Sequence, residues 1–394
     1  MAIFTAIATL ALIGAGGLVT SHEAGMAVPD WPTTYGYNMF FFPISKWVGG
    51  IFYEHTHRLI ASLVGLLTTI LALWVFGVKS RPLIRWGGCL LIFIGVLVSL
   101  EFPLKRVDGV LLVTLGVVAF SCSFFWPRSQ PSPSWLRWLA IAAFIAVILQ
   151  GVLGGLRVVA MKDEIGIFHA ILAQLFLVLI SAIALCTSQK WQKLVDSSPE
   201  EKVKDLQYLM LAGSALILGQ LALGATMRHQ HAGLAVPDFP LAHGKIWPPM
   251  DAPFLQRFNQ SRVDVRDFAP VTAFHVSIHM AHRVGAILIL IVVGYCAVQA
   301  RRILGRDHPV TKVCQVWVGL ILCQGVLGAL TVLKNKPADI ATAHVLFGAL
   351  SLVVGSMLTI TCFSYARRAD TAPEMAYVPQ MASAHSQCSR TSGF

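Results

Sequence analysis

Four histidines form the residue pattern in this sequence that is best suited to binding a metal group. They fall into two pairs, His57 with His169 and His282 with His344, and each lies in an apolar segment. Two imidazoles that face each other from different helices of a bundle suit bis-histidine ligation of a haem iron. One buried histidine is equally well explained by a hydrogen bond to a neighbour. Two pairs at matched positions favour haem ligation.

A carboxylate accompanies only one of these pairs. Glu54 precedes His57 by three positions in YEHTHRLIAS (53–62), so the two side chains share a helix face. The matched position in the second half is His279. An acid one turn from an iron ligand can move protons or stabilise developing charge. We therefore expect Glu54 to be catalytic, with the reactive site in the first half and a fixed cofactor site in the second.

An arginine directly follows one ligand candidate in each half. Arg58 follows His57, and Arg283 follows His282. A guanidinium beside a haem would pair well with a propionate carboxylate. A guanidinium at a helix end can also reach out to lipid phosphate. The sequence leaves both roles open.

The composition places these residues in a membrane protein. The 394 residues are 56% hydrophobic and only 12% charged, with a mean hydropathy of +0.69. A soluble protein carries about twice that charged fraction. The formal net charge is +11, but the basic residues sit at helix ends without a nucleic-acid-binding motif. Orientation in a membrane explains them better, and we expect no nucleic-acid partner.

Ten segments are apolar and long enough, at roughly 20 residues each, to cross a bilayer as helices. We predict an all-α polytopic membrane protein with spans at about 3–20, 56–77, 84–102, 108–126, 135–157, 165–187, 207–228, 273–299, 310–333 and 340–366. Most basic residues then lie on the side of the termini, although Lys105 and Arg106 do not. By the positive-inside rule both termini are cytoplasmic, and loops 21–53 and 229–272 lie outside. We expect the membrane to be a bacterial inner membrane.

Four segments of the first half return in the same order in the second half. HEAGMAVPDWP (22–32) matches QHAGLAVPDFP (230–240), EHTHR (54–58) matches HMAHR (279–283), LQGVLGGLRVV (149–159) matches CQGVLGALTVL (323–333), and IFHAILAQLFL (167–177) matches TAHVLFGALSL (342–352). This order predicts two repeated four-helix bundles. Because the repeats run in the same sense, an axis along the membrane normal should relate them. The hairpin 84–126 is inserted in the first half.

The repeat divides the chain into four parts. We predict an N-terminal half-bundle with the substrate site at 1–187, a cytoplasmic linker at 188–206, a C-terminal half-bundle with the cofactor site at 207–366, and a disordered tail at 367–394. In the paired outer loops, Asp30 and Asp238 are best interpreted as turn-forming acids bonded to local backbone. The glycines of 151–156 and 325–330 leave room for a planar guest or simply pack helices.

Together these residues resemble the haem A synthase family of cytochrome oxidase assembly enzymes. The resemblance rests on EHTHR (54–58), on His169 and His344, on the QGVLGGLRV segment and on the AGxAVPDxP loop, and it covers most of 1–186 and 207–366. It implies two four-helix halves, with a haem b cofactor in the second and the substrate haem O in the first. The implied reaction oxidises a ring methyl of haem O to a formyl group by monooxygenation, giving haem A.

The resemblance also implies residue roles and partners. Glu54 matches the essential glutamate, His57 and His169 with Arg58 the substrate side, and His282 and His344 with Arg283 the haem b side. It further implies a haem O synthase that supplies the substrate, a separate electron donor and the lipid bilayer, and it leaves a homo-oligomer open. Two features depart from the family: the outer loops lack the cysteine pairs of some members, and the hairpin exceeds the usual eight spans.

Two other functions compete with this interpretation. A dihaem b-type electron-transfer cytochrome would also use two histidine pairs, but it has no need of a carboxylate in one half alone. A transporter with duplicated halves would show helices broken at mid-membrane, and the segments around the histidines show little such interruption.

Overall fold

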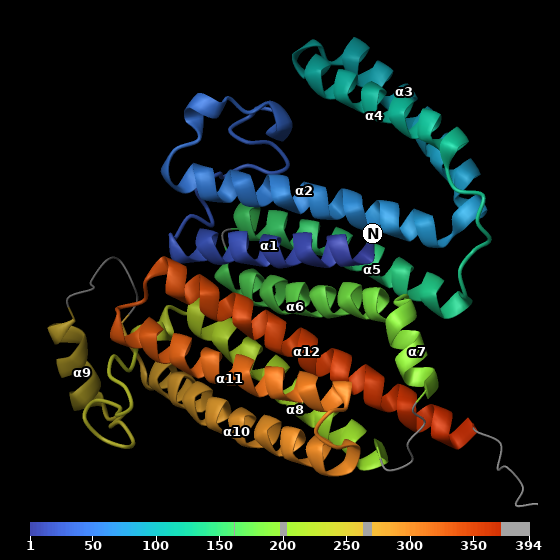
Figure 1. The fold of residues 1–394 in the computed structure, drawn as a ribbon. Coiled ribbons are helices and arrows are strands. Elements are labelled where there is room, and N and C mark those ends of the chain that lie inside the picture. The colour runs from blue at the N-terminus through green and yellow to red at the C-terminus, as the bar shows by residue number, and fades with distance from the viewer. Residues whose placement is uncertain (161, 198–202, 263–269, 372–394) are drawn as a thin grey trace, which may run out of the picture.

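The structure is a computed structural model that describes residues 1–160, 162–197, 203–262 and 270–371 (Figure 1). Within these residues, ten helices are long and apolar enough to cross a membrane, as predicted. They are α1 (Ala2–Ser21), α2 (Gly49–Val75), α3 (Ser80–Glu101), α4 (Arg106–Phe125), α5 (Ser134–Ala160), α6 (Asp163–Cys186), α8 (Lys204–His229), α10 (Ala273–Leu304), α11 (Pro309–Leu333) and α12 (Ala338–Thr371).

Helix α2 begins earlier than predicted, and this difference affects the candidate site. The helix begins at Gly49, where a positive φ of 55° ends the preceding loop, rather than at 56. Residues 53–58 therefore lie inside the helix, and Glu54 and His57 share a face of a formed helix.

The spans pack as two groups of four. Helices α1, α2, α5 and α6 surround one another in the first group, and α8, α10, α11 and α12 do so in the second. The groups meet where α1 and α6 pack against α12, and where α6 packs against α8 (Figure 1). Each group therefore contains the four helices that the repeat assigns to that half. The symmetry axis along the membrane normal stays a prediction.

Each group has its own apolar core. The first-half core includes Val64, Ile180 and Ile183, and the second-half core is built around Trp317. The Trp317 ring is fully buried, and its indole Nε1 donates a hydrogen bond of 2.9 Å to the carbonyl oxygen of Ser351. A buried indole needs such an acceptor, because an unpaired N–H is costly in an apolar interior.

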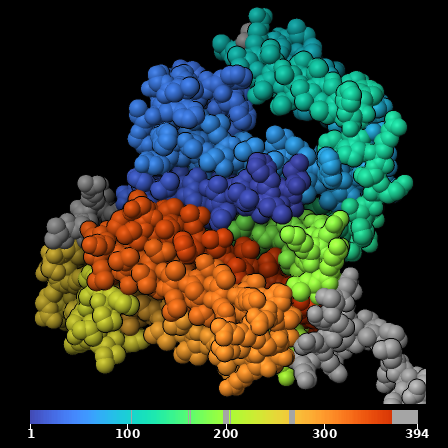
Figure 2. Space-filling model, viewed as in Figure 1, coloured from blue at the N-terminus to red at the C-terminus, as the bar shows by residue number. Residues whose placement is uncertain are grey.

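The inserted hairpin of α3 and α4 packs mainly on itself. A Cβ on Gly88 would lie 2.8 Å from the carbonyl oxygen of Gly116, and one on Gly116 would lie 2.7 Å from that of Gly88. Small residues therefore allow the two backbones to approach closely. Figure 2 shows open space between the hairpin and α2. At the outer end, Asn38 Nδ2 donates a hydrogen bond of 2.6 Å to Asp108 Oδ1, which ties the hairpin to the first outer loop.

Two shorter helices lie in segments that the sequence analysis treated as loop or linker. Helix α7 (Gln189–Ser197) docks on α12, because Trp191 Nε1 donates a hydrogen bond of 2.9 Å to Thr361 Oγ1. Helix α9 (Ala252–Ser261) lies in the second outer loop, with the Asp251 side chain as its N-cap. Helix α12 continues to Thr371, past the predicted end at 366. The rest of the predicted tail, 372–394, lies outside the described residues.

The two long loops lie at one end of the helices, and α7 and the N-terminus lie at the other (Figure 1). We therefore expect reporters fused after residues 195 and 370 to read cytoplasmic, and a reporter after residue 260 to read outside. A fusion inside the turn between α3 and α4, near Lys105, should also read outside despite its positive charge. A reversed pattern at 195 and 260 would contradict the predicted orientation.

Candidate functional site

An arginine near the outer end of α2 holds the first outer loop on the helix bundle. Arg58 Nη2 donates a hydrogen bond of 2.8 Å to the carbonyl oxygen of Val28. Its Nη1 donates to the carbonyl oxygens of Asp30, at 2.7 Å, and Thr33, at 3.0 Å. The guanidinium is thus surrounded by backbone carbonyls of the loop, which it ties together.

Arg283 of α10 does the same for the second outer loop. Its Nη2 donates to the carbonyl oxygens of Val236, at 3.1 Å, and Asp238, at 2.6 Å, and its Nη1 donates to that of Leu241, at 2.8 Å. These acceptors match those of Arg58 across the repeat. The predicted contact of either arginine with a haem propionate stays a prediction, but both guanidiniums already have a structural use.

Glu54 belongs to the first of these networks. It is buried, at 3% exposed. Its Oε2 accepts a hydrogen bond of 2.8 Å from the backbone N–H of Val28, and its Oε1 accepts one of 2.6 Å from Arg58 Nη2. Both carboxylate oxygens therefore help to fix the loop over the site. The structure places Glu54 one turn from His57 as predicted, and it also gives the carboxylate a structural role.

Asp30 closes a tight turn in the first outer loop. It accepts hydrogen bonds from the backbone N–H groups of Tyr35, at 2.7 Å, and Gly36, at 2.8 Å, and from Thr33 Oγ1, at 2.5 Å. Burial raises the pKa of Asp30, but these hydrogen bonds outweigh it and hold the pKa below the ordinary 3.8. Tyr35 and Gly36 have φ of 50° and 77°, the left-handed conformation that this turn requires.

Asp238 closes the matched turn in the second loop. It accepts from the backbone N–H groups of His243, at 2.7 Å, and Gly244, at 2.8 Å. Burial again raises the pKa of Asp238, and the hydrogen bonds to its ionised form again lower it overall. The interpretation of Asp30 and Asp238 as turn-forming acids is therefore confirmed.

The four candidate ligands share one packing arrangement. In each case the imidazole Cε1 lies close to a glycine of a neighbouring helix, where even a Cβ would be in contact with the ring. A Cβ on the glycine would lie 3.0 Å from His57 (Gly16), 3.4 Å from His169 (Gly154), 3.3 Å from His282 (Gly224) and 3.2 Å from His344 (Gly328). The sequence motifs at 151–156 and 325–330 contain two of these glycines. Gly16 and Gly224 were missed, although they too match across the repeat.

Glutamine side chains support three of the four histidines. Their amide groups donate to the histidine carbonyl oxygens: Gln150 to His169 at 3.0 Å, Gln220 to His282 at 2.7 Å, and Gln324 to His344 at 2.8 Å. The residue that corresponds to Gln220 in the first half is Leu12. Sequence reasoning missed these residues, although the matched QG of 150–151 and 324–325 was visible.

The histidines fit a bis-histidine haem. Each of His57, His169, His282 and His344 has a buried Nδ1 without a hydrogen-bond partner in the described part of the chain. The rings of His282 and His344 lie close together in an edge arrangement, with centroids 6.3 Å apart and an interplanar angle of 70°. The two imidazoles are therefore close enough that both could hold one metal between them. His57 and His169 lie within electrostatic range of each other.

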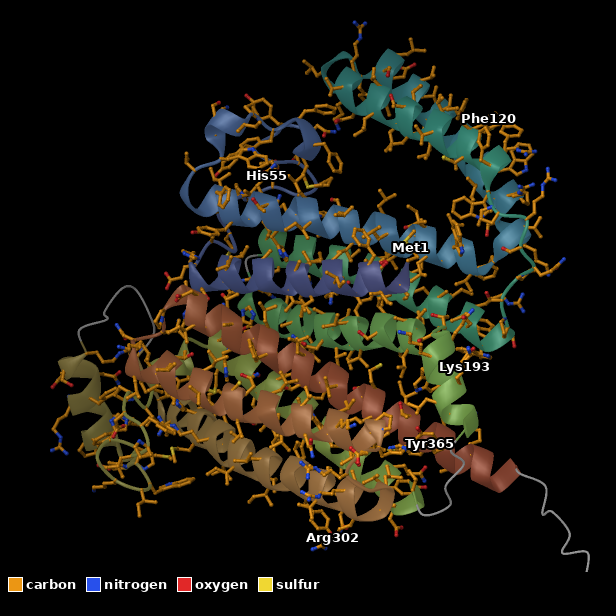
Figure 3. All side chains as sticks on the ribbon, viewed as in Figure 1. Met1, His55, Phe120, Lys193, Arg302 and Tyr365 are labelled. Carbon is orange, nitrogen blue, oxygen red and sulfur yellow. The ribbon has the colours of Figure 1, made fainter. Side chains whose placement is uncertain are left out.

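The other outer histidines occupy different surroundings. His55 is fully buried beneath the first loop, where its Nδ1 lies 3.2 Å from Thr34 Oγ1 and its ring packs against Trp47, with centroids 4.8 Å apart (Figure 3). His279, the counterpart of Glu54, is also buried, at 3% exposed. We interpret both as supporting residues rather than ligands.

The sequence from 105 to 355 matches the family described as cytochrome oxidase assembly protein. This range is more than half of the chain. The protein belongs to this family.

Relatives that match this cytochrome oxidase assembly protein nearly end to end carry one name. The Heme A synthase of Halalkalibacterium halodurans is 25% identical over 366 residues, which cover 91% of this chain and 93% of the relative. That of Geobacillus kaustophilus is 23% identical, with 89% and 88% covered. That of Shewanella oneidensis is 23% identical, with 93% and 96% covered.

Acid should open the two outer turns. Because the pKa of Asp30 and Asp238 is lower in the folded protein than its ordinary value, their contribution to stability is present above that value and is lost as the pH falls through the folded pKa. We expect amide hydrogen exchange in 30–36 and 238–244 to accelerate roughly tenfold or more once the carboxyls are protonated, after correction for intrinsic rates.

Asp30→Asn and Asp238→Asn should produce the same local acceleration at neutral pH. Asp307→Asn is the matched control, because that carboxylate is almost fully exposed, at 96%, in a loop near the other end of the helices. Unchanged exchange in both turn variants would contradict the proposed role of these hydrogen bonds.

Proposed function

We propose that this protein is a haem A synthase, which oxidises a ring methyl of haem O to a formyl group and so supplies haem A for cytochrome oxidase assembly. One observation carries the proposal: two matched pairs of half-buried imidazoles with buried Nδ1 atoms, each ring in contact with a glycine, lie in one chain, and only one pair has a carboxylate beside it. The relatives named Heme A synthase, which extend over nearly the whole chain, support the same assignment.

The first half is the substrate site in this proposal. His57 and His169 hold the iron of haem O between α2 and α6, and Gly16 and Gly154 leave room for their rings. Glu54 lies one turn from His57 under a fixed loop. From there it accepts or relays a proton as the methyl is oxidised, or stabilises positive charge that develops on the ring. The loop keeps bulk water from the reacting edge, because Arg58 and Glu54 tie it to the helix end.

The second half is the cofactor site. His282 and His344 hold a haem b. Gln220 and Gln324 donate hydrogen bonds to the carbonyl oxygens of these two histidines and so fix the backbone of the helices that carry the histidines. When bound, this haem supplies one-electron transfer toward the substrate half. His279 stands where the first half has Glu54, so no carboxylate of α10 lies beside this pair.

A dihaem electron-transfer cytochrome is the second candidate. Both oxygens of Glu54 already have partners, Val28 in the loop and Arg58 on α2, so the carboxylate has a use that requires no substrate chemistry. Separation of haems B, O and A extracted from membranes with and without this protein distinguishes the two functions. Only a synthase changes the ratio of haem O to haem A.

The same proposal names partners and location. A haem O synthase delivers the substrate, a separate donor supplies electrons, and oxygen provides the formyl oxygen atom. The protein lies in a bacterial inner membrane with both termini cytoplasmic, so both haem sites are in the outer half of the bilayer. Association into a homo-oligomer is compatible with this arrangement.

Replacement of Glu54 should separate chemistry from loop structure. Glu54→Gln keeps the shape and an acceptor oxygen but loses the charge, so we expect normal insertion, retained haem b and accumulation of haem O in place of haem A. Loss of a positioned acid–base group lowers a rate by roughly 10²–10⁴-fold. Haem b content and haem A output are measured on the same membranes.

The control for this variant is Glu164→Gln, which removes an exposed carboxylate near the outer end of α6. A Glu54→Gln protein that loses haem b and folded protein in proportion to haem A output would show that the carboxylate acts only through the loop.

The second-half ligands can be tested by spectroscopy alone. His282→Ala and His344→Ala should each remove the low-spin haem b spectrum from the purified protein, because each variant loses one of the two imidazoles that would hold the haem. His22→Ala, which changes an exposed outer histidine, should retain the spectrum. Unchanged haem content and spectrum in both ligand variants would sink the assignment.

A further inference from the structure

Two more arginines lie within the spans, one in each half. Arg157 is in the last turn of α5, and Arg228 is in the last turn of α8. They have no basic counterpart across the repeat, where Thr331 and Thr20 stand instead. Charged residues within spans are costly and are usually functional, so each needs a partner or a purpose.

Both arginines occupy the layer just outside the histidine pairs. Arg157 follows Gly154, the seat of His169, by three positions, and Arg228 follows Gly224, the seat of His282, by four. Residues three or four apart lie one above the other on a helix. Because α5 and α8 both run toward the end that carries the outer loops (Figure 1), each arginine follows, one turn outward along its helix, the glycine that contacts an imidazole.

Arg228 reaches across the junction between the two halves. Its Nη2 donates to the carbonyl oxygen of Gly17 and to Ser21 Oγ, both on α1. Both acceptors are neutral, and within the described residues no carboxylate forms an ion pair with Arg228. Thr342, two residues before His344 on α12, lies against the same Gly17, so this guanidinium is close to the second histidine pair.

Arg157 lies against the first outer loop where that loop leaves α1. A Cβ on Gly25 would lie 2.7 Å from its Nη2. The two guanidiniums are near enough to interact electrostatically with each other, and Arg157 with both His57 and His169. Two positive charges thus gather beside the two histidine pairs, in a region where water screens them poorly.

A haem fits this arrangement, because its two propionate carboxylates project from one edge of the macrocycle. Arginine is the side chain best suited to bind carboxylates with paired hydrogen bonds. We propose that Arg157 binds a carboxylate of the substrate haem in the first half, and that Arg228 binds a carboxylate of the haem in the second half. This inference rests on the proposed function, and it gives the carboxylate-binding role to residues other than Arg58 and Arg283.

The assignment has a consequence for specificity. A macrocycle held only by two imidazoles can rotate about the axis that joins them. An arginine that holds one carboxylate edge permits a single orientation and so determines which ring methyl is presented to Glu54. Arg157 is then a positioning residue for the substrate.

The test compares haem b with its dimethyl ester, in which both carboxylates are blocked. The apo-protein, purified from haem-depleted cells, is titrated with each, and low-spin absorbance reports binding. A His57→Ala background leaves only the second site, and a His282→Ala background leaves only the first. We expect each remaining site to bind the free acid at least roughly tenfold more tightly than the ester, as expected for a charge-assisted hydrogen bond.

Arg228→Gln is tested in the His57→Ala background and Arg157→Gln in the His282→Ala background. Each should weaken binding of the free acid and leave binding of the ester unchanged, so that the ratio of the two affinities falls close to one. Arg228→Lys and Arg157→Lys keep the charge and should retain part of the preference, which shows that the site is still folded. Arg257→Gln on α9 removes an exposed charge of the outer loop and should retain the full preference for the free acid.

A preference that survives both glutamine variants, or that is absent in the unsubstituted sites, would overturn the inference while leaving haem binding intact. Failure of the protein with all its histidines to form any low-spin haem would instead overturn the proposed function. The two failures are therefore distinguished by the same titration.

Discussion

A guanidinium near the outer end of a membrane helix needs acceptors, and the loop carbonyls around Arg58 and Arg283 provide them. Three carbonyl oxygens converge on each arginine, so the loop must fold back over the helix that carries it. The turns closed by Asp30 and Asp238 bring those carbonyls into place. If either guanidinium lost its acceptors, it would have to leave the bundle, and the loop would no longer cover the site.

The histidine pairs depend on a second constraint, which is close helix packing. Each ring lies close to where a side chain would begin on the facing helix, so the position of each imidazole depends on the glycine opposite it. The glutamine bonds to histidine carbonyls then fix neighbouring helices against one another. Such supports restrict the motion of the helices that carry the imidazoles, which favours a stable site over a transient one.

In the proposed function the two halves use this shared frame for different purposes. Where the first half has Glu54 and Leu12, the second has His279 and Gln220. The first half has a buried carboxylate beside its imidazoles and fewer backbone supports, as suits a site that must accept and release a substrate. The second has one more amide support and no carboxylate in that position, as suits a retained cofactor. The inserted hairpin does not enter either site, because it packs mainly on itself and touches the first outer loop through Asn38.

The sequence alone determined the ten spans, the four histidines and the asymmetry at Glu54. Spans follow from the length of apolar runs, which local composition sets, and the duplication exposed the matched positions without any coordinates. The turn-forming role of Asp30 and Asp238 also followed from local chemistry, since an aspartate bonds the backbone a few residues further on.

Only the tertiary structure decided what each charged group contacts. From the sequence, Arg58 and Arg283 could equally well bind a haem propionate or a lipid phosphate. Sequence spacing does not show which loop carbonyls lie near the end of a helix. The partners of Glu54 lie 26 residues earlier in the chain as well as four later, and Arg228 contacts Ser21, 207 residues away. Such contacts depend on how the helices pack against one another, and that packing is a property of the whole bundle rather than of any segment.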